Sequence, residues 1–153
     1  MAKSSKIIRK GQVVVVASSP KDESFLMSLR NNEAFLKRSF KNWPVTKVEH
    51  HRWFKNFLSC SYSYTIYCDS VRVGHIRFEK KKTGIFSIGI ALLPRYQGHG
   101  IADKALRFAL VDLKQKERKA EIVAEVRSDN YPAQKFFLRS GFNLEFFTYK
   151  YYL

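Results

Sequence analysis

The chain has 153 residues, of which 45% are hydrophobic, and a formal net charge of +15. This length and composition suit one domain with a sizeable core and exclude a disordered chain. No apolar run is long enough to cross a membrane, residues 1–12 lack the apolar segment of a signal peptide, and two cysteines are too few for a disulfide framework, so the sequence predicts a reduced, cytoplasmic protein.

The first half of the chain predicts one strand, two helices and a set of strands. Residues 12–17 contain four consecutive valines, which suit a strand. Residues 25–36 carry apolar side chains at helical spacing, with a break expected near Asn31 and Asn32. Thr46 and Glu49 have the spacing of a capping box, which predicts the start of a second helix. Residues 62–68, 71–79 and 85–92 then predict three strands of an antiparallel meander.

The second half predicts two helices, each followed by a strand. Apolar residues recur at helical spacing from Gly100 to Leu113, and a short strand is expected over residues 121–126. The last helix is expected between a cap at residues 128–130 and Gly141, which suits the position after a helix end. The aromatic-rich residues 142–153 predict a closing strand. The expected order is therefore β-α-α-β-β-β-α-β-α-β.

A glycine-containing loop joins the last strand of the meander to the next helix. It reads Arg95-x-x-Gly98-x-Gly100-x-Ala102. Two glycines let a ligand approach the backbone, and a helix N-terminus presents unpaired N–H groups and the positive end of the helix dipole. The loop therefore predicts a site for a phosphate or pyrophosphate.

This spacing resembles the acyl-CoA pyrophosphate loop of the GNAT superfamily of N-acetyltransferases. A second segment, Val126-x-x-x-Asn130-x-x-Ala133, is similar to the second cofactor segment of that family. The resemblance covers nearly the whole chain. It implies an α/β (α+β) GNAT fold, with a central mixed and mostly antiparallel sheet flanked by about four helices, as a single domain over residues 1–153.

The resemblance also implies acetyl-CoA as cofactor and transfer of its acetyl group to a primary amine. Backbone N–H groups near the end of the central strand are expected to contact the oxyanion. The cofactor-binding positions implied are Ala91, Leu92, Arg95, Gln97, Gly98, His99, Gly100, Ile101, Ala102, Asn130, Ala133 and Phe137.

Glu125 is the expected general base. It alternates with the apolar Ala124 and Val126 at the end of a strand, and it lies five residues before Asn130, as does a catalytic glutamate in ribosomal-protein N-terminal acetyltransferases and some amino-sugar acetyltransferases. Phe137 stands where many family members carry a tyrosine that serves the departing thiolate. Tyr131, a tyrosine in residues 149–152 or solvent remain alternatives, as does departure of the thiolate itself.

The acceptor is expected to bind the first two helices. The pattern His50-x-x-Trp53, after a helix that contains Arg30 and Asn32, resembles amino-sugar nucleotide acetyltransferases of the pseudaminic-acid pathway, which act on the 4-amino group of a UDP-linked sugar. The net positive charge agrees with such an anionic, small-molecule acceptor. Ordinary packing of His50 and Trp53 inside the protein is an equal alternative.

Two other functions stay open. One is acetylation of ribosomal-protein N-termini, favoured by the segment around Glu125, and the other is a non-catalytic domain that binds acyl-CoA or RNA. Basic residues are scattered with one tight run at 80–82, so nucleic-acid binding is disfavoured. No metal site is expected, because no cluster has the spacing of metal ligands. Exposed strand edges leave a homodimer open.

Overall fold

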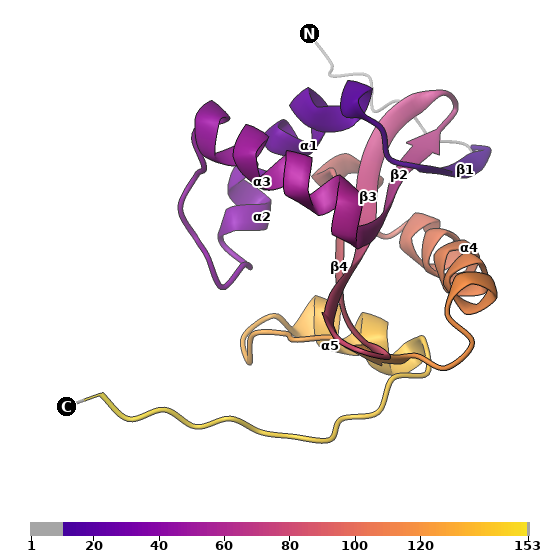
Figure 1. Cartoon of the computed structure of the whole chain (residues 1–153). Coiled ribbons are helices and arrows are strands. Elements are labelled where there is room, and N and C mark those ends of the chain that lie inside the picture. Colours follow the sequence, from indigo (N-terminus) through magenta and orange to yellow (C-terminus); the bar gives the residue numbers. More distant parts are fainter. Residues whose placement is uncertain (1–10, 153) are drawn as a thin grey trace, which may run out of the picture.

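The computed structural model describes residues 11–152, in which helices cover both faces of a five-stranded sheet (Figure 1). The strands are β1 (Val13–Ala17), β2 (Ser61–Cys68), β3 (Val71–Lys82), β4 (Ile85–Leu92) and β5 (Glu121–Val123). The helices are α1 (Glu23–Arg30), α2 (Glu33–Leu36), α3 (Lys47–Cys60), α4 (Ile101–Lys116) and α5 (Tyr131–Arg139), with short 3-10 turns η1 (Pro20–Asp22) and η2 (Pro94–Tyr96).

The strands lie in the order β1-β2-β3-β4-β5. All neighbours are antiparallel except β4 and β5, which are parallel. This arrangement confirms the mixed, mostly antiparallel sheet and the meander of three strands. The β4–β5 ladder ends at the pair Ser87 and Val123, so the two strands separate over the second half of β4.

Local capping explains where the first three helices begin and end. The predicted break near Asn31 is real, because the side chain of Asn32 accepts a hydrogen bond from the backbone of Ala34 at 3.0 Å and starts α2 as a new turn. The predicted capping box is also confirmed. Thr46 Oγ1 accepts from the Glu49 backbone N–H at 3.3 Å, and the Glu49 carboxylate accepts from the Thr46 N–H at 2.8 Å.

The sheet separates two apolar clusters. Alternate residues of β3 and β4, such as Phe78 and Ile88, pack against the buried face of α4, which includes Leu106. A smaller cluster lies between α1 and α3, centred on Phe54 and Phe57. The residues of β3 and β4 that alternate with Phe78 and Ile88 point to the other face of the sheet and therefore face α1–α3. Some of them are charged, and a charged side chain is not stable in an apolar core.

Two expectations for the C-terminal part were wrong. Strand β5 ends at Val123 rather than near residue 126, because its partner β4 diverges from it. Residues 142–152 form no strand, although the sequence predicts one; residue 153 lies outside the described part. Their aromatic-rich sequence suits a strand, but a strand is stable only when its backbone is hydrogen-bonded to a neighbouring strand. The described chain offers no such neighbour here. Figure 1 shows this segment running extended beyond α5, and Tyr149 is 90% exposed.

Candidate active site

The divergence of β4 from β5 opens one side of a cavity of about 650 Å³. One wall consists of residues 87–92 of β4, and the opposite walls come from the loop before α4, from one side of α5 along its length and from α2 with the loop after it. Beyond Ser87 the backbone groups of β4 on the β5 side have no ladder partner among residues 11–152. A ligand that enters the cavity can therefore bind this backbone, at Ala91 and Leu92 among others.

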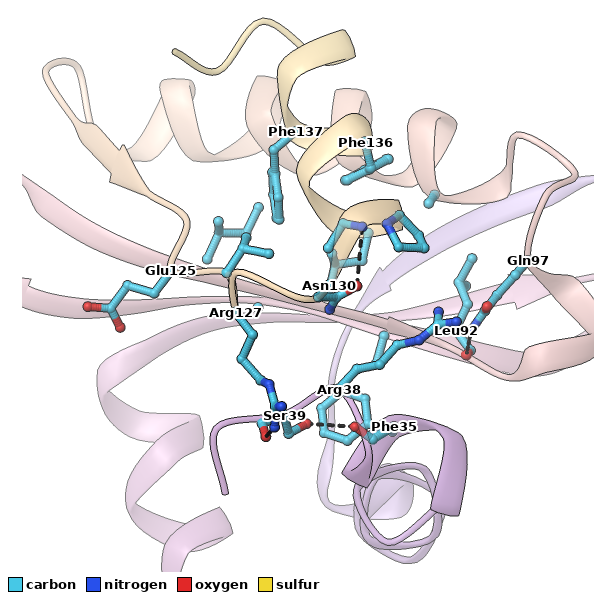
Figure 2. A pocket seen from close by; sticks show the side chains of 18 of the residues that line it. Phe35, Arg38, Ser39, Leu92, Gln97, Glu125, Arg127, Asn130, Phe136 and Phe137 are labelled. Carbon is cyan, nitrogen blue, oxygen red and sulfur yellow. Dashed lines mark hydrogen bonds between the residues drawn. The ribbon is translucent and has the colours of Figure 1, made fainter. Parts of the chain in front are cut away.

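The glycine loop forms one end of the cavity. Gly98 and Gly100 have φ angles of +77° and +73°, which favour glycine, and a Cβ at either position would meet no atom within 4 Å. Gly100 is the N-cap of α4, so the first N–H groups of a 16-residue helix begin here. Gln97 closes the turn by donating to the Leu92 carbonyl at 3.1 Å (Figure 2). This open backbone surface can bind an anionic group.

Two residues expected in the loop do not line the cavity. Arg95 and His99 are absent from its wall, whereas Gln97, Gly98, Gly100, Ile101 and Ala102 are in it. The Arg95 guanidinium lies over the Tyr96 ring instead, 4.9 Å from the ring centre.

The second cofactor segment lies across the cavity from β4. Asn130 caps α5, and its side chain accepts from the Ala133 N–H at 3.4 Å. Phe137, one turn further, is buried and packs edge-to-face against the rings of Phe136 and Phe142. Asn130, Ala133 and Phe137 all line the cavity.

Glu125 lies in the irregular segment that follows β5 and lines the cavity. In Figure 2 its carboxylate is at the side of the cavity opposite Gln97. No hydrogen bond or ion pair joins it to another residue of the described chain. An unpaired carboxylate at this end is chemically able to accept a proton.

Arg30 and Asn32 line the same cavity from α1 and α2. Arg30 Nη2 donates to the Lys41 carbonyl at 3.0 Å, while its Nη1 is buried and has no hydrogen-bond partner within the described residues. Burial and the charge of Arg77 lower the pKa of Arg30. Arg77 is itself paired with Glu79 at 2.5 Å.

His50 and Trp53 do not line the cavity, although His50 lies close enough to Arg30 for the arginine charge to add to the effect of burial in lowering the pKa of His50. The His50 ring is buried against Trp53 and Phe54, with ring centres 5.3 and 5.9 Å apart, and burial lowers its pKa. Trp53 stacks on Phe57 at 4.4 Å. Both side chains contribute to the packing of α3.

Several cavity residues were missed from the sequence. Arg77 and Glu79 lie on the face of β3 opposite to the core residue Phe78, and their alternation in the sequence was a usable signal. Arg38 and Arg127 come from irregular segments, for which periodicity predicts no direction. Within residues 11–152, no group of three or more histidine, cysteine or acidic side chains is placed to hold a metal ion, and no helix is long and apolar enough to span a membrane.

Comparison with known families gives one match over most of the chain. Residues 13–143 match the model of the acetyltransferase (GNAT) domain. No curated protein matches the sequence.

Solved structures with the same fold are numerous, and three show the range. A domain from Methanocaldococcus jannaschii has a TM-score of 0.77 at 21% identity, with 87% of this chain and 89% of that chain covered. Spermidine N-acetyltransferase from Vibrio cholerae, solved with CoA and spermine, has a TM-score of 0.76 at 18% identity, with 88% and 82% covered. An acetyl transferase from Salmonella typhimurium that modifies the N-terminal serine of ribosomal protein L7/L12 has a TM-score of 0.72 at 22% identity, with 90% and 85% covered.

Proposed function

Because the chain belongs to the acetyltransferase (GNAT) family, it is an N-acetyltransferase that uses acetyl-CoA, and we propose that its acceptor is the primary amine of an anionic, nucleotide-linked amino sugar. The 4-amino group of a UDP-linked deoxy sugar is the specific candidate. The single observation that carries the proposal is the buried, unpartnered Nη1 of Arg30 beside the like charge of Arg77.

The cavity fits the cofactor at its glycine end. The open space over Gly98 and Gly100, together with the N-terminus of α4, would hold the pyrophosphate, because a side chain at either glycine would occupy that space. The unpaired edge of β4 at Ala91 and Leu92 would bind the extended arm. Asn130 and Phe137 would flank the arm from α5. Bound acetyl-CoA supplies an activated acetyl thioester.

In the proposed reaction Glu125 removes the proton from the acceptor ammonium group, directly or through water. The amine nitrogen then attacks the acetyl carbon, the bond between that carbon and sulfur breaks, and the nitrogen releases a second proton to solvent as the amide forms. Backbone N–H groups near Ala91 and Leu92 would stabilise the negative charge that develops on the acetyl oxygen. No tyrosine, histidine or cysteine is among the cavity residues of the described chain, so solvent would supply the proton that the sulfur takes.

Electrostatics of the cavity favour an anionic acceptor. Its wall holds seven lysine and arginine residues but three aspartate and glutamate residues. A buried donor without a partner costs free energy, and a small shift of the Arg30 side chain, which lines the cavity, would let a phosphate accept from Nη1 and remove this cost. A polyamine acceptor is positively charged, as the cavity wall is, so the wall would repel it.

Acetylation of a protein N-terminus remains the second candidate. The segment from Glu125 to Asn130 resembles that of ribosomal-protein N-terminal acetyltransferases, and a peptide of acidic sequence would also suit the cavity charge. A peptide acceptor does not require a phosphate site at Arg30.

The test is release of free thiol from acetyl-CoA with a panel of amines. The panel contains UDP-linked 4-amino sugars, ribosomal N-terminal peptides, spermidine and an aminoglycoside. We expect turnover with the UDP-linked sugar and at least about a hundredfold lower kcat/KM with the other amines. A peptide as best substrate would keep the chemistry and refute the proposed acceptor.

A further inference from the structure

Residues 37–45 form a strap that joins α2 to α3 across the cavity, and we call them the acceptor strap. None of these residues is buried, and Phe40 is 65% exposed although it lines the cavity. A segment with no apolar side chain in the core has low local stability unless polar contacts hold it. The position of Phe40 and Lys41 in the cavity wall therefore depends on hydrogen bonds to the strap backbone.

Two residues hold the strap from the end of α1. Arg30 Nη2 donates to the carbonyls of Lys41 and Trp43 at 3.0 and 3.4 Å. The Asn31 side chain exchanges two hydrogen bonds with the backbone of Val45, at 2.9 and 2.8 Å. These contacts fix the C-terminal part of the strap and leave its first part, which follows α2, to be held by other contacts.

Arg127 holds that first part from the other side of the cavity. Its Nη1 donates to the Ser39 carbonyl at 3.3 Å, and Figure 2 shows the side chain reaching from the segment before α5 to Ser39. Asp129 fixes the direction of the guanidinium through two bonds, from Nε at 2.9 Å and from Nη2 at 2.6 Å. The fork geometry of arginine serves both partners at once.

The segment that carries Arg127 is firmly tied to α5. The Arg127 carbonyl accepts from the Asn130 backbone N–H at 3.0 Å and from Gln134 Nε2 at 3.1 Å. Gln134 Nε2 also donates to the Ser128 carbonyl at 2.9 Å. The hydrogen bond from Arg127 to Ser39 therefore joins a firmly held segment to the weakly packed strap. It determines the position of the strap rather than that of α5.

We propose that Arg127 is a positioning residue, which fastens the acceptor strap to the cofactor segment and so places Phe40 and Lys41 against the acceptor. The inference rests on the proposed function in one respect, that the strap side of the cavity is the acceptor side. Arg127 then acts on acceptor binding and leaves cofactor binding at the glycine loop unchanged.

Hydrogen exchange tests the link without any substrate. The amides of residues 35–39 are hydrogen-bonded within α2 and the turn that follows, so their exchange reports on the anchored end of the strap. In Arg127→Ala we expect their exchange to rise at least about fivefold, while the amides of α3 and α5 are unchanged. Arg118→Ala, which removes an exposed arginine outside this cavity, is the matched control and should leave all these rates unchanged. Unchanged exchange at 35–39, or an equal rise throughout the protein, would overturn the proposal.

Kinetics separate positioning from direct contact with the cofactor. With the best amine found in the panel, whatever its class, Arg127→Ala should raise the acceptor KM about tenfold, because the released strap no longer holds Phe40 and Lys41 against the acceptor, and leave CoA affinity within about twofold. Arg127→Lys keeps the positive charge but not the forked guanidinium group, so its acceptor KM should lie between those of the wild type and Arg127→Ala. An equal loss of CoA affinity would show that Arg127 binds the cofactor, and an unchanged acceptor KM would overturn the proposal even if the acceptor is not a sugar nucleotide.

Discussion

Burial lowers the pKa of Arg30, the like charge of Arg77 adds to this effect, and no carboxylate among residues 11–152 pairs with Arg30. Arg77 has Glu79 as its partner, at 2.5 Å. Both guanidinium groups line the cavity, and one buried nitrogen of Arg30 has no hydrogen-bond partner within the described residues, an arrangement that an anion would stabilise. This pair is the structural reason to expect a phosphate on the acceptor.

Removal of Arg30 should weaken binding of the nucleotide part of the acceptor. In Arg30→Ala we expect the affinity for UDP, measured by calorimetry, to fall about tenfold or more, because a charge-assisted hydrogen bond to phosphate is lost together with the two bonds that hold the acceptor strap. CoA affinity should stay within about twofold. Arg30→Lys keeps the charge and should recover part of the UDP affinity. Equal UDP binding by the wild type and Arg30→Ala would refute the phosphate site.

Replacement of the proposed base should slow the chemical step. We expect Glu125→Gln to lower kcat about a hundredfold at neutral pH, because the acceptor ammonium group then loses its proton only to solvent. The loss should shrink as the pH rises and more of the amine is already deprotonated. Glu121→Gln, an exposed glutamate of β5 outside the cavity, is the matched control. A kcat within twofold of wild type in Glu125→Gln would remove Glu125 as the base.

A large side chain at the glycine loop should block the cofactor. Gly100→Trp places an indole where a Cβ now meets open space, and we expect CoA affinity to fall at least roughly a hundredfold. Gly141→Trp is the matched control, because Gly141 also has a positive φ, +93°, and open space around it but lies outside the cavity wall. The two variants share the backbone strain. Similar CoA affinities in both folded variants would sink the assignment of the loop.

The buried His75 should make stability depend on pH. Its Nε2 lies 2.7 Å from Ser63 Oγ, and burial, helped by the charges of Arg77 and His50 and opposed by that of Asp22, lowers its pKa from 6.5 to about 3. The unfolded chain therefore binds a proton near pH 6.5 that the folded protein does not bind until near pH 3. Stability is thus fully present above pH 6.5 and falls as the pH decreases, by at most about 1.4 kcal/mol for each pH unit.

Urea unfolding at pH 7, 6 and 5 measures this slope. His75→Gln keeps a hydrogen-bonding group near Ser63 but cannot take up the proton, so its slope should be smaller than that of the wild type. The buried His50, whose pKa is also lowered, contributes in the same direction and remains in the variant. Equal slopes in the two proteins would contradict the assignment of a neutral His75 to the folded state.

The parts of the fold that local chemistry determines were predictable from the sequence. The capping box of Thr46, the break before α2 at Asn32 and the start of α4 at Gly100 each depend on residues within one turn of the chain. The separation of β4 from β5 and the lack of a strand over residues 142–152 were not predictable. Strand pairing depends on partners far away in sequence, which the hydrophobic pattern does not identify.

The candidate site divides in the same way. The loop from Gln97 to Ala102, apart from His99, and the segment at Asn130 lie together in the cavity wall, and each has a motif of its own. His50 and Trp53 share one face of α3, but a helical pattern does not tell a cavity-facing side from a core-facing side. His50 proved to be buried in the packing of α3, whereas Trp53 stacks on Phe57 and stays partly exposed. Arg127 lies in an irregular segment, and its side chain is oriented by two hydrogen bonds to Asp129. The hydrophobic pattern of the sequence does not predict such an orientation.

The most direct measurement is kcat/KM for a matched pair of acceptors, a UDP-linked 4-amino sugar and the same amino sugar without its nucleotide. The account predicts that the nucleotide-linked acceptor is preferred at least about a hundredfold, and that the preference declines as salt is added, since it rests on charge. Equal turnover of the two acceptors would contradict it, because the arginines of the cavity would then have no phosphate to bind.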